Sequence, residues 1–305
     1  MIGLQEKRIC FLGLGLISGS LAMALRESGW LGERVAWGPR EPSLKTGLEL
    51  GVIDRYSLDM SEAVEGADMI VVGAPPMATG ELLSSILPTL PAKTVVTDLA
   101  SMKGWVVERI SADHPGFVPG HPIAGSENSG VAAASADLFT GREVILTPLE
   151  HTAADAIERV RRMWLQVGAR VTSMSVAEHD AALAASSHMP HMVAYALTMA
   201  LAGHELEPMQ HGGGALRDMT RIAGSDPVMW RDIVLTNRDA VLQAMALFGA
   251  EMQSLQALIE AGDGAALETY FAHCRQQRRS HDEVLNPMLA EAACANEPAD
   301  TGASE

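Results

Sequence analysis

The chain has 305 residues, of which 48% are hydrophobic, and this is enough for two domains of ordinary size with sizeable cores. Its formal net charge of −16 argues against nucleic acid and against an anionic membrane surface as binding partners. A chain this acidic must gather its few cations locally to bind an anion, so basic residues inside motifs carry particular weight.

The first half of the chain alternates short apolar runs with helical patterns. The runs predicted as strands are Arg8 to Leu12, Arg34 to Trp37, Met69 to Val72, Thr94 to Asp98, Glu143 to Thr147 and Arg170 to Ser173. The segments predicted as helices are Ser18 to Glu27, Leu44 to Leu50, Glu81 to Leu87 and Ala153 to Val167. Strands and helices that alternate at this spacing predict a doubly wound, mostly parallel α/β sheet of the Rossmann type.

The pattern changes near Met174, and beyond it almost every segment has helical periodicity. The predicted helices are Val176 to Ser187, Met189 to His204, Ala215 to Ala223, Pro227 to Leu235, Arg238 to Glu260 and Gly264 to Ser280. We therefore expect a dinucleotide-binding domain over residues 1–174 and an all-helical domain over 175–290. The polar residues 291–305 are expected to form a disordered tail.

A glycine-rich turn, Gly13-Leu14-Gly15-Leu16-Ile17-Ser18-Gly19, follows the first predicted strand and opens the first helix. Gly13 permits a tight turn, Gly15 lets the backbone approach a pyrophosphate, and Ser18 stands where the third glycine usually sits. The helix N-terminus supplies amide donors for the phosphates. The alternative is a strand–turn–helix without a ligand. The predicted cofactor-binding residues are Gly13, Gly15, Leu16, Ile17, Ser18, Arg40, Pro75 and Ser101.

The end of the second predicted strand bears on the 2′ group of the cofactor. An acidic residue about 20 positions after the turn usually binds the ribose hydroxyls of NAD. Here Gly38 or Pro39 takes that place and Arg40 follows. Without a carboxylate a 2′-phosphate is not repelled, and a guanidinium can pair with it bidentately, so we expect NADP rather than NAD. In the alternative, Arg40 stacks on the adenine or faces water and Glu41 does the acidic residue's work.

Further motifs follow the turn in a fixed order. They are Asp98-x-x-Ser101-x-Lys103, Gly120-His121-Pro122-Ile123-x-Gly125-x-Glu127, Ser187-His188-Met189-Pro190-His191, and Arg217-Asp218-Met219-Thr220-Arg221-Ile222-Ala223-x-Ser225-Asp226-Pro227-x-x-Trp230. The ordered set resembles the prephenate/arogenate (cyclohexadienyl) dehydrogenase family of tyrosine biosynthesis. The resemblance covers most of residues 8 to 240. It implies oxidative decarboxylation of prephenate or L-arogenate, with hydride transfer to a nicotinamide cofactor.

The proposed catalytic residues are His121, expected in a loop after Phe117 to Pro119, and Ser101. The substrate is a cyclohexadienol, and its hydroxyl proton must be taken as the carbonyl forms. A neutral imidazole titrates near the working pH and suits this task. Ser101 is expected to hydrogen-bond the same hydroxyl or to orient the imidazole, and the resemblance implies this work for both residues. A structural loop histidine is the alternative for His121.

A substrate with two carboxylates needs a cation in so acidic a chain. The resemblance implies that Arg221 holds the ring carboxylate; the alternative is an ion pair with Asp218 or Asp226, a role that also fits Arg217. Lys103 is interpreted as structural, with its charge offsetting Asp98.

The remaining pocket residues also follow from the resemblance. It puts His191 at the substrate side-chain end and His188 in support, and either also fits a core histidine. The two lie three apart on one helical face, but no carboxylate ligand is near in the pattern, so we reject a metal pair. The residues expected to contact substrate are Arg221, His191, His188, Ser126, Glu127 and Trp230.

Three other functions compete with this one. A relative that acts on 3-hydroxy acids is disfavoured by the His-Pro-Ile and Thr-Arg-Ile-Ala motifs, whereas one that acts on 4-amino-4-deoxyprephenate is not excluded. A catalytically silent NADP-binding sensor is disfavoured because Ser101, His121 and Arg221 are intact.

Assembly and location follow from the helices and the cysteines. The apolar helices Met189 to Ala202 and Val241 to Leu258 exceed what a small domain can bury alone, so we expect a homodimer with interleaved helices. The three cysteines show no metal spacing and no disulfide framework, and the chain begins without a signal segment. These features predict a cytoplasmic protein.

Overall fold

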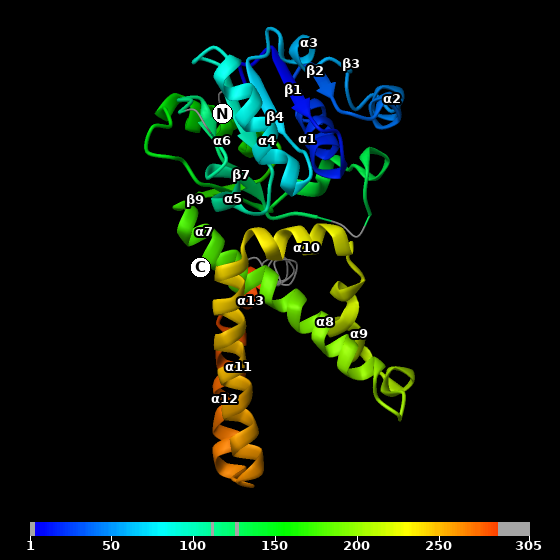
Figure 1. The fold of residues 1–305 in the computed structure, drawn as a ribbon, viewed down its shortest axis with the longest axis vertical. Helices are drawn as coiled ribbons and strands as arrows, with labels where there is room; N and C mark the ends of the chain where they lie inside the picture. Colours follow the sequence, from blue (N-terminus) through cyan, green and yellow to red (C-terminus); the bar gives the residue numbers. More distant parts are fainter. Residues whose placement is uncertain (1–3, 111–112, 126–127, 286–305) are drawn as a thin grey trace, which may run out of the picture. The chain divides into compact units, whose positions relative to one another are not determined.

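The computed structural model describes residues 4–110, 113–125 and 128–285 (Figure 1). The chain divides into two compact units, Met1–Ala244 and Met245–Glu305. The first unit holds the sheets and the helices up to the start of α11 (Arg238–Glu260). The second holds the rest of α11, α12 (Gly264–Arg279) and α13 (Asp282–Leu285).

The main sheet has six parallel strands in the order β3-β2-β1-β4-β5-β6. They are β1 (Arg8–Leu12), β2 (Glu33–Trp37), β3 (Arg55–Ser57), β4 (Met69–Val72), β5 (Val95–Asp98) and β6 (Phe117–Val118). This order belongs to doubly wound dinucleotide-binding folds and confirms the predicted fold class. β3 and β6 were not predicted, because runs of three and two residues carry no usable periodicity.

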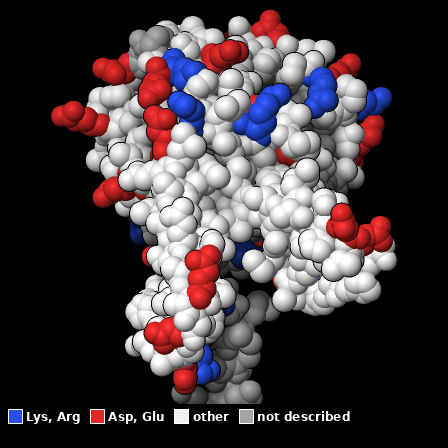
Figure 2. Space-filling view, turned by 60° about the horizontal axis from the view of Figure 1, so that its bottom comes forward, with Lys and Arg blue, Asp and Glu red and all other residues white. Residues whose placement is uncertain are grey.

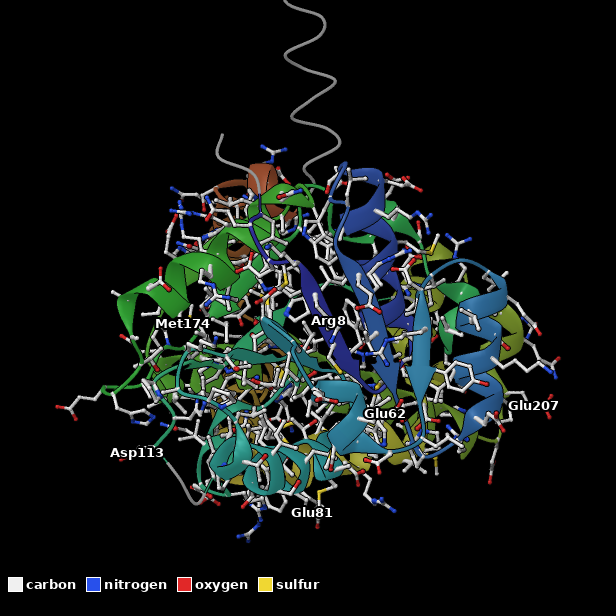
Figure 3. The ribbon with its side chains drawn as sticks, turned by 90° about the horizontal axis from the view of Figure 1, so that it is seen from above. Arg8, Glu62, Glu81, Asp113, Met174 and Glu207 are labelled. Carbon is white, nitrogen blue, oxygen red and sulfur yellow. The ribbon has the colours of Figure 1, made fainter. Side chains whose placement is uncertain are left out.

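Helices cover both faces of this sheet, as the alternation of side chains along a strand requires. Ile9 and Phe11 of β1 share one core cluster with residues of α1 (Leu16–Glu27), α2 (Glu41–Glu49) and α6 (Ala154–Gln166). Cys10 and Leu12 pack on the other face with α3 (Met60–Val64), α4 (Pro76–Ile86) and α5 (Lys103–Val107). In Figure 3, Arg8 lies near the centre of the view, at the start of this central strand.

A second, three-stranded sheet corrects two expectations. Its strands are β7 (Gly120–Pro122), β8 (Glu143–Leu146) and β9 (Arg170–Ser173), with β7 antiparallel to β8 and β8 parallel to β9. The last two predicted strands therefore lie outside the main sheet. His121 lies in a strand opposite Ile145 rather than in a loop. Pro119 separates β6 from β7, and since proline has no N–H to donate, the first ladder ends there.

The helical part of the first unit begins with α7 (Val176–Leu183). A π-helical turn, Ala184–His188, joins it directly to α8 (Met189–Ala202), so the two predicted helices are continuous. α9 (Gly214–Thr220) passes into a 3₁₀ turn, Arg221–Gly224, and α10 (Pro227–Thr236) follows. Trp230 and Ile233 of α10 pack into the core cluster that also contains α4 and α5 side chains. Side chains of α10 and of α8 are thus packed against the nucleotide-binding part of the unit.

Large apolar side chains are exposed along the helical part. Figure 2 shows wide uncharged areas between scattered charges on the face it presents. None of the helices among residues 4–285 for which the structure gives a description is long and apolar enough to cross a membrane. The exposed apolar side chains of α8, α10 and α11 include Met199, Val228, Leu235, Leu242, Met245, Leu247, Phe248 and Met252.

Candidate active site

The glycine-rich turn has the backbone that a pyrophosphate needs. Gly13 has a φ of 94°, and a Cβ there would lie 2.6 Å from the Gly73 carbonyl oxygen, so only glycine fits. A Cβ on Gly15 would meet no atom within 4 Å, which leaves the backbone open to a ligand. Gly15 is the N-cap of α1 and makes no side-chain cap, so the first amides of α1, Leu16 and Ile17 among them, keep their donors for a phosphate.

The surroundings of Ser18 show how the turn accommodates a serine at the third glycine position. Its side chain is buried, and its Oγ has no hydrogen-bond partner within the described part of the chain. A Cβ on Gly73 would lie 1.8 Å from this Oγ, so the serine fits because Gly73 faces it. The residues of the turn therefore fit a dinucleotide.

The carboxyl ends of four strands meet at one edge of the sheet. The amide of Gly13 donates to the Trp37 carbonyl at 2.8 Å, that of Gly73 to Leu12 at 2.8 Å, and that of Leu99 to Val72 at 3.0 Å. Pro75, the N-cap of α4, and Ser101 follow β4 and β5 at this edge. In such sheets the ligand binds outside these carboxyl ends, where the strand order reverses between β1 and β4.

The predicted 2′ site lies where β2 leads into α2. Arg40 is the N-cap residue of α2 and is exposed. The carboxylate of Glu41 accepts a hydrogen bond from the Tyr56 hydroxyl at 2.9 Å. This contact occupies one oxygen of the only acidic side chain that the sequence offered as a ribose ligand.

A buried ion pair joins β5 to the strand of His121. Lys103 and Asp98 are fully buried, and the Lys103 ammonium contacts the Asp98 carboxylate and the carbonyl of Gly120. Asp98 also accepts from the amides of Ala100 at 3.0 Å and Gly120 at 3.3 Å. The pairing of Lys103 with Asp98 is as predicted. It ties the segment that carries half-buried Ser101 to β7.

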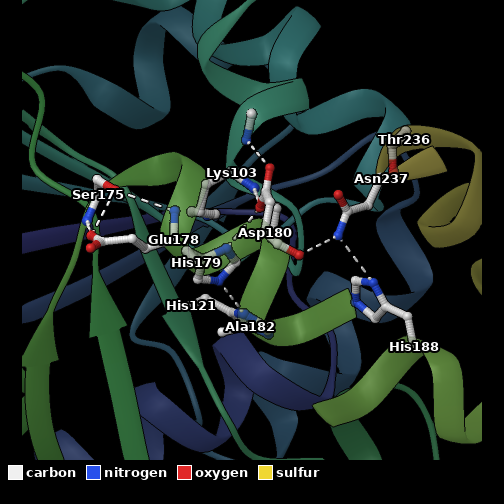
Figure 4. A network of polar contacts seen from close by, with 12 residues as sticks. Lys103, His121, Ser175, Glu178, His179, Asp180, Ala182, His188, Thr236 and Asn237 are labelled. Atoms are coloured by element: carbon white, nitrogen blue, oxygen red, sulfur yellow. Dashed lines mark hydrogen bonds and ion pairs between the residues drawn. The ribbon is translucent and has the colours of Figure 1, made fainter. Parts of the chain in front are cut away.

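His121 is buried and neutral. Only 8% of the residue is exposed, and its Nδ1 lies 2.9 Å from His179 Nε2 (Figure 4). Burial lowers the pKa of His121 well below its usual value, and the charge of Lys103 acts in the same direction. Near neutral pH the imidazole is therefore free to accept a proton.

His188 is held inside the helical part. It is 1% exposed, and its Nδ1 accepts from the Asn237 amide at 3.2 Å. Asn237 also donates to the main-chain oxygen of Asp180 at 2.8 Å. Burial lowers the pKa of His188 to about 4, although the charge of Asp180 opposes this. This is the geometry of a core histidine that supports its neighbours.

His191 stacks on Trp230, with ring centroids 3.6 Å apart. Its Nδ1 donates to the carbonyl of Ser187 at 2.9 Å, which leaves Nε2 free. Burial lowers the pKa of His191, and the positive charge of Arg221 lowers it further. The indole Nε1 of Trp230 is buried and has no partner within the described residues.

Arg221 and Arg217 have different surroundings. Arg217 pairs with Asp218 at 3.2 Å, and Asp226 caps α10 by accepting from the Met229 amide at 2.7 Å. Arg221 is exposed and forms no ion pair with any residue that the structure describes. The intradomain ion pair that the sequence allowed for Arg221 is thus made by Arg217.

Other predicted residues differ in their outcome. Ser126 and Glu127 lie outside the described residues. Within the described ranges no three His, Cys, Asp or Glu side chains are grouped to hold a metal ion. The sequence did not single out His179, Asp180 or Asn237, which surround His121 and His188. The adjacent pair His179-Asp180 was the one signal, and it has no motif around it.

Two family models match consecutive parts of the chain. The model for the nucleotide-binding domain of prephenate dehydrogenase matches residues 21–173, and the model for the dimerization domain of prephenate dehydrogenase matches residues 175–273. The first match begins after the glycine-rich turn, so the geometry of that turn is independent support.

Relatives and solved structures agree with the family models. The chain is 34% identical to a cyclohexadienyl dehydrogenase from Zymomonas mobilis over 89% of this chain and 95% of that one. It is 33% identical to a prephenate dehydrogenase from Bacillus subtilis, over 90% of this chain and 76% of that one.

Two solved structures share the fold over nearly their whole length. The prephenate dehydrogenase of Aquifex aeolicus, in complex with hydroxyphenyl propionate and NAD+, superposes with a TM-score of 0.85 at 33% identity, over 90% of this chain and 98% of that one. The Synechocystis arogenate dehydrogenase superposes with a TM-score of 0.80 at 27% sequence identity, over 90% of this chain and 99% of that one. The ordered motifs, the dinucleotide turn and these matches lead to one conclusion: the chain belongs to the prephenate dehydrogenase family.

Proposed function

We propose that the chain catalyses the oxidative decarboxylation of prephenate, with hydride transfer to NADP, in tyrosine biosynthesis. The observation that carries this proposal is the neutral, buried His121, tied through Gly120 to the carboxyl end of β5. A proton acceptor near the sheet edge at which a dinucleotide turn lies is what oxidation of a carbinol requires. Membership of the prephenate dehydrogenase family supports the choice of substrate.

His121 acts on the hydroxyl of the substrate. Its Nε2 takes the hydroxyl proton while the carbonyl forms at the carbinol carbon. The bound nicotinamide supplies the acceptor for the hydride that leaves this carbon. The ring carboxylate then leaves as carbon dioxide, its bonding electrons complete the aromatic ring, and the phenol oxygen recovers the proton. Ser101 positions the hydroxyl, and Arg221 pairs with the ring carboxylate.

One observation also favours arogenate as a substrate beside prephenate. It differs from prephenate in the side chain, where an ammonium replaces the keto group. In neutral His191 the Nδ1 proton is engaged by Ser187, so the free Nε2 is an acceptor that suits an ammonium. The similarity to a cyclohexadienyl and to an arogenate dehydrogenase points the same way. We propose that prephenate is preferred and that arogenate also turns over.

Absorbance of the reduced nicotinamide, measured with each substrate and each cofactor, tests this function. We expect turnover of prephenate with a higher kcat/KM for NADP than for NAD. A tenfold preference for arogenate, about 1.4 kcal/mol in transition-state binding, would reverse the substrate order. Failure of both substrates with both cofactors would disprove the function.

The cofactor preference has its own variant. Replacing Pro39 with Asp and Arg40 with Ala should shift the ratio of kcat/KM values toward NAD, because it adds a ribose ligand and removes the cation for the 2′-phosphate. Lys45→Ala, which removes an exposed charge on the same helix, is the control and should leave the ratio unchanged. A wild-type preference for NAD would contradict the selection of NADP by residues 37–41.

Arg221→Ala should weaken substrate binding far more than cofactor binding. A cation that pairs with a carboxylate in a partly desolvated site contributes about 2–5 kcal/mol, so KM for prephenate should rise steeply. Arg217→Ala is the matched control, since Arg217 is exposed and already paired with Asp218. If Arg217→Ala raises KM and Arg221→Ala does not, the two roles must be exchanged.

We propose a nucleotide-binding domain over 1–174 and a helical domain over 175–290, in line with family models that meet between 173 and 175. The dimerization-domain match and the exposed apolar side chains of α8, α10 and α11 support a homodimer. Free thiols at Cys10 and Cys274 fit a reducing cytoplasm.

A further inference from the structure

Asp180 is held as an ionised hydrogen-bond acceptor near β7, the strand that holds His121. Its Oδ1 accepts from the Lys103 amide at 2.9 Å, and its Oδ2 accepts from the Gly104 amide at 2.7 Å. Burial alone would raise the pKa of Asp180, but the hydrogen bonds from His179, Lys103 and Gly104 outweigh it and bring the pKa below its usual value. An ionised carboxylate can only accept, so every polar hydrogen that faces Asp180 belongs to its partner.

This fixes the proton on His179. Its Nδ1 lies 2.8 Å from Asp180 Oδ1 and must carry the hydrogen of that bond. In the neutral ring Nε2 is then an acceptor. His179 is fully buried, so no water reaches this lone pair, and the atom that faces it at 2.9 Å is His121 Nδ1.

The same reasoning fixes His121. Its Nδ1 must donate to His179 Nε2, so the lone pair of the neutral His121 ring lies on Nε2. A histidine side chain in water favours the opposite tautomer, with the hydrogen on Nε2. The contacts in Figure 4 thus hold His121 in the form that can take a proton at Nε2.

We propose that His179 and Asp180 are positioning residues that fix the tautomer of His121 and stabilise its imidazolium after it takes the substrate proton. The proposal rests on the function given above. A buried carboxylate does the same for a catalytic histidine in hydrolases, without becoming protonated itself. Here a second imidazole stands between the carboxylate and the base, because α7 places His179 and not Asp180 next to β7.

The start of α7 is built to hold this geometry. Ser175 and Glu178 form a reciprocal capping box, in which the Ser175 side chain accepts from the Glu178 amide and Glu178 accepts from the Ser175 amide. The cap fixes the first turn, which ends at His179 and leads directly to Asp180. Asp180 in turn binds the first residues of α5, so α5 and α7 hold the base between them.

A matched pair of variants tests the proposal. His179→Phe keeps a planar ring of similar size but offers His121 no acceptor. His179→Gln keeps an amide oxygen near the place of Nε2. We expect His179→Phe to lower kcat by about tenfold or more, which is part of the 10²–10⁴-fold that a positioned general base contributes, with little change in KM for either substrate. His179→Gln should recover most of the lost turnover, and His151→Phe, a change on the surface, should have no effect.

The tautomer itself can be observed without turnover. Nitrogen-15 spectra of the histidine-labelled wild-type protein should show His121 with the hydrogen on Nδ1, and in His179→Phe the hydrogen should move to Nε2. A wild-type His121 with its hydrogen on Nε2, or equal kcat values for His179→Phe and wild type, would overturn the proposal. Inactive wild-type protein would refute the function instead, while the spectra would still decide the tautomer. If His179→Phe does not fold, the wild-type spectrum still shows the tautomer of His121, and kcat of His179→Gln still tests the role of His179.

Discussion

Replacing His121 with Asn is expected to lower kcat by about 10²–10⁴-fold, the usual contribution of a positioned general base. The amide nitrogen of Asn can still donate to His179, so the contact at Nδ1 is kept while the acceptor at Nε2 is lost. Cofactor affinity, measured by fluorescence titration, should not change, because the glycine-rich turn lies on other strands. Turnover near that of the wild type would exclude His121 as the base.

The pH profile gives a second readout for His121. A base works only when deprotonated, so kcat/KM falls as the pH drops through its pKa. Burial, together with the charge of Lys103, puts this pKa well below 6.5. We therefore expect the acid limb of the wild type to lie well below pH 6.5 and to be absent in His121→Asn. A limb at the usual histidine pKa would show that His121 is more hydrated than its burial indicates.

Replacing Lys103 with Met is expected to lower the free energy of unfolding by about 3–5 kcal/mol, since it leaves the Asp98 carboxylate buried without a counter-charge. The carbonyl of Gly120 loses a donor at the same time. The midpoint of thermal unfolding, followed by circular dichroism, should fall by roughly 10 °C.

Two further variants separate charge from size in this experiment. Lys45→Met removes an exposed lysine and should leave the midpoint near that of the wild type. The double variant Asp98→Asn with Lys103→Met removes both charges and should recover part of the loss, because no lone buried charge remains. If Lys103→Met is as stable as Lys45→Met, the ion pair does not support the fold.

The sequence by itself determined the elements whose signal is local. The strand predicted at Met69 to Val72 and the helix at Arg238 to Glu260 have the predicted bounds, because an apolar run or a long 3.6-residue period needs no partner to be recognised. The glycine-rich turn was predictable for the same reason, because the positive φ of Gly13 depends on one residue that has no Cβ. The pair Asp98 and Lys103, five positions apart, was also within reach.

Helix ends were less certain where a tertiary contact or a proline decides them. The helix predicted to begin at Glu81 begins at Pro76 in the structure. Proline is favoured in the first turn of a helix, whereas the helical pattern on which the prediction depended starts only later in the sequence. The predicted break at Met189 is absent because a π turn carries the chain from α7 into α8.

Only the tertiary structure decided how His121 is held. His121 is in a strand because three residues pair with β8, and so short a strand has no periodicity of its own. His121 meets His179 across 58 positions, and Lys103 meets Asp180 across 77. Each contact is set by the packing of α5, α7 and β7 around one buried point. No local pattern encodes such a contact, because its hydrogen bonds join residues whose neighbours in sequence lie elsewhere.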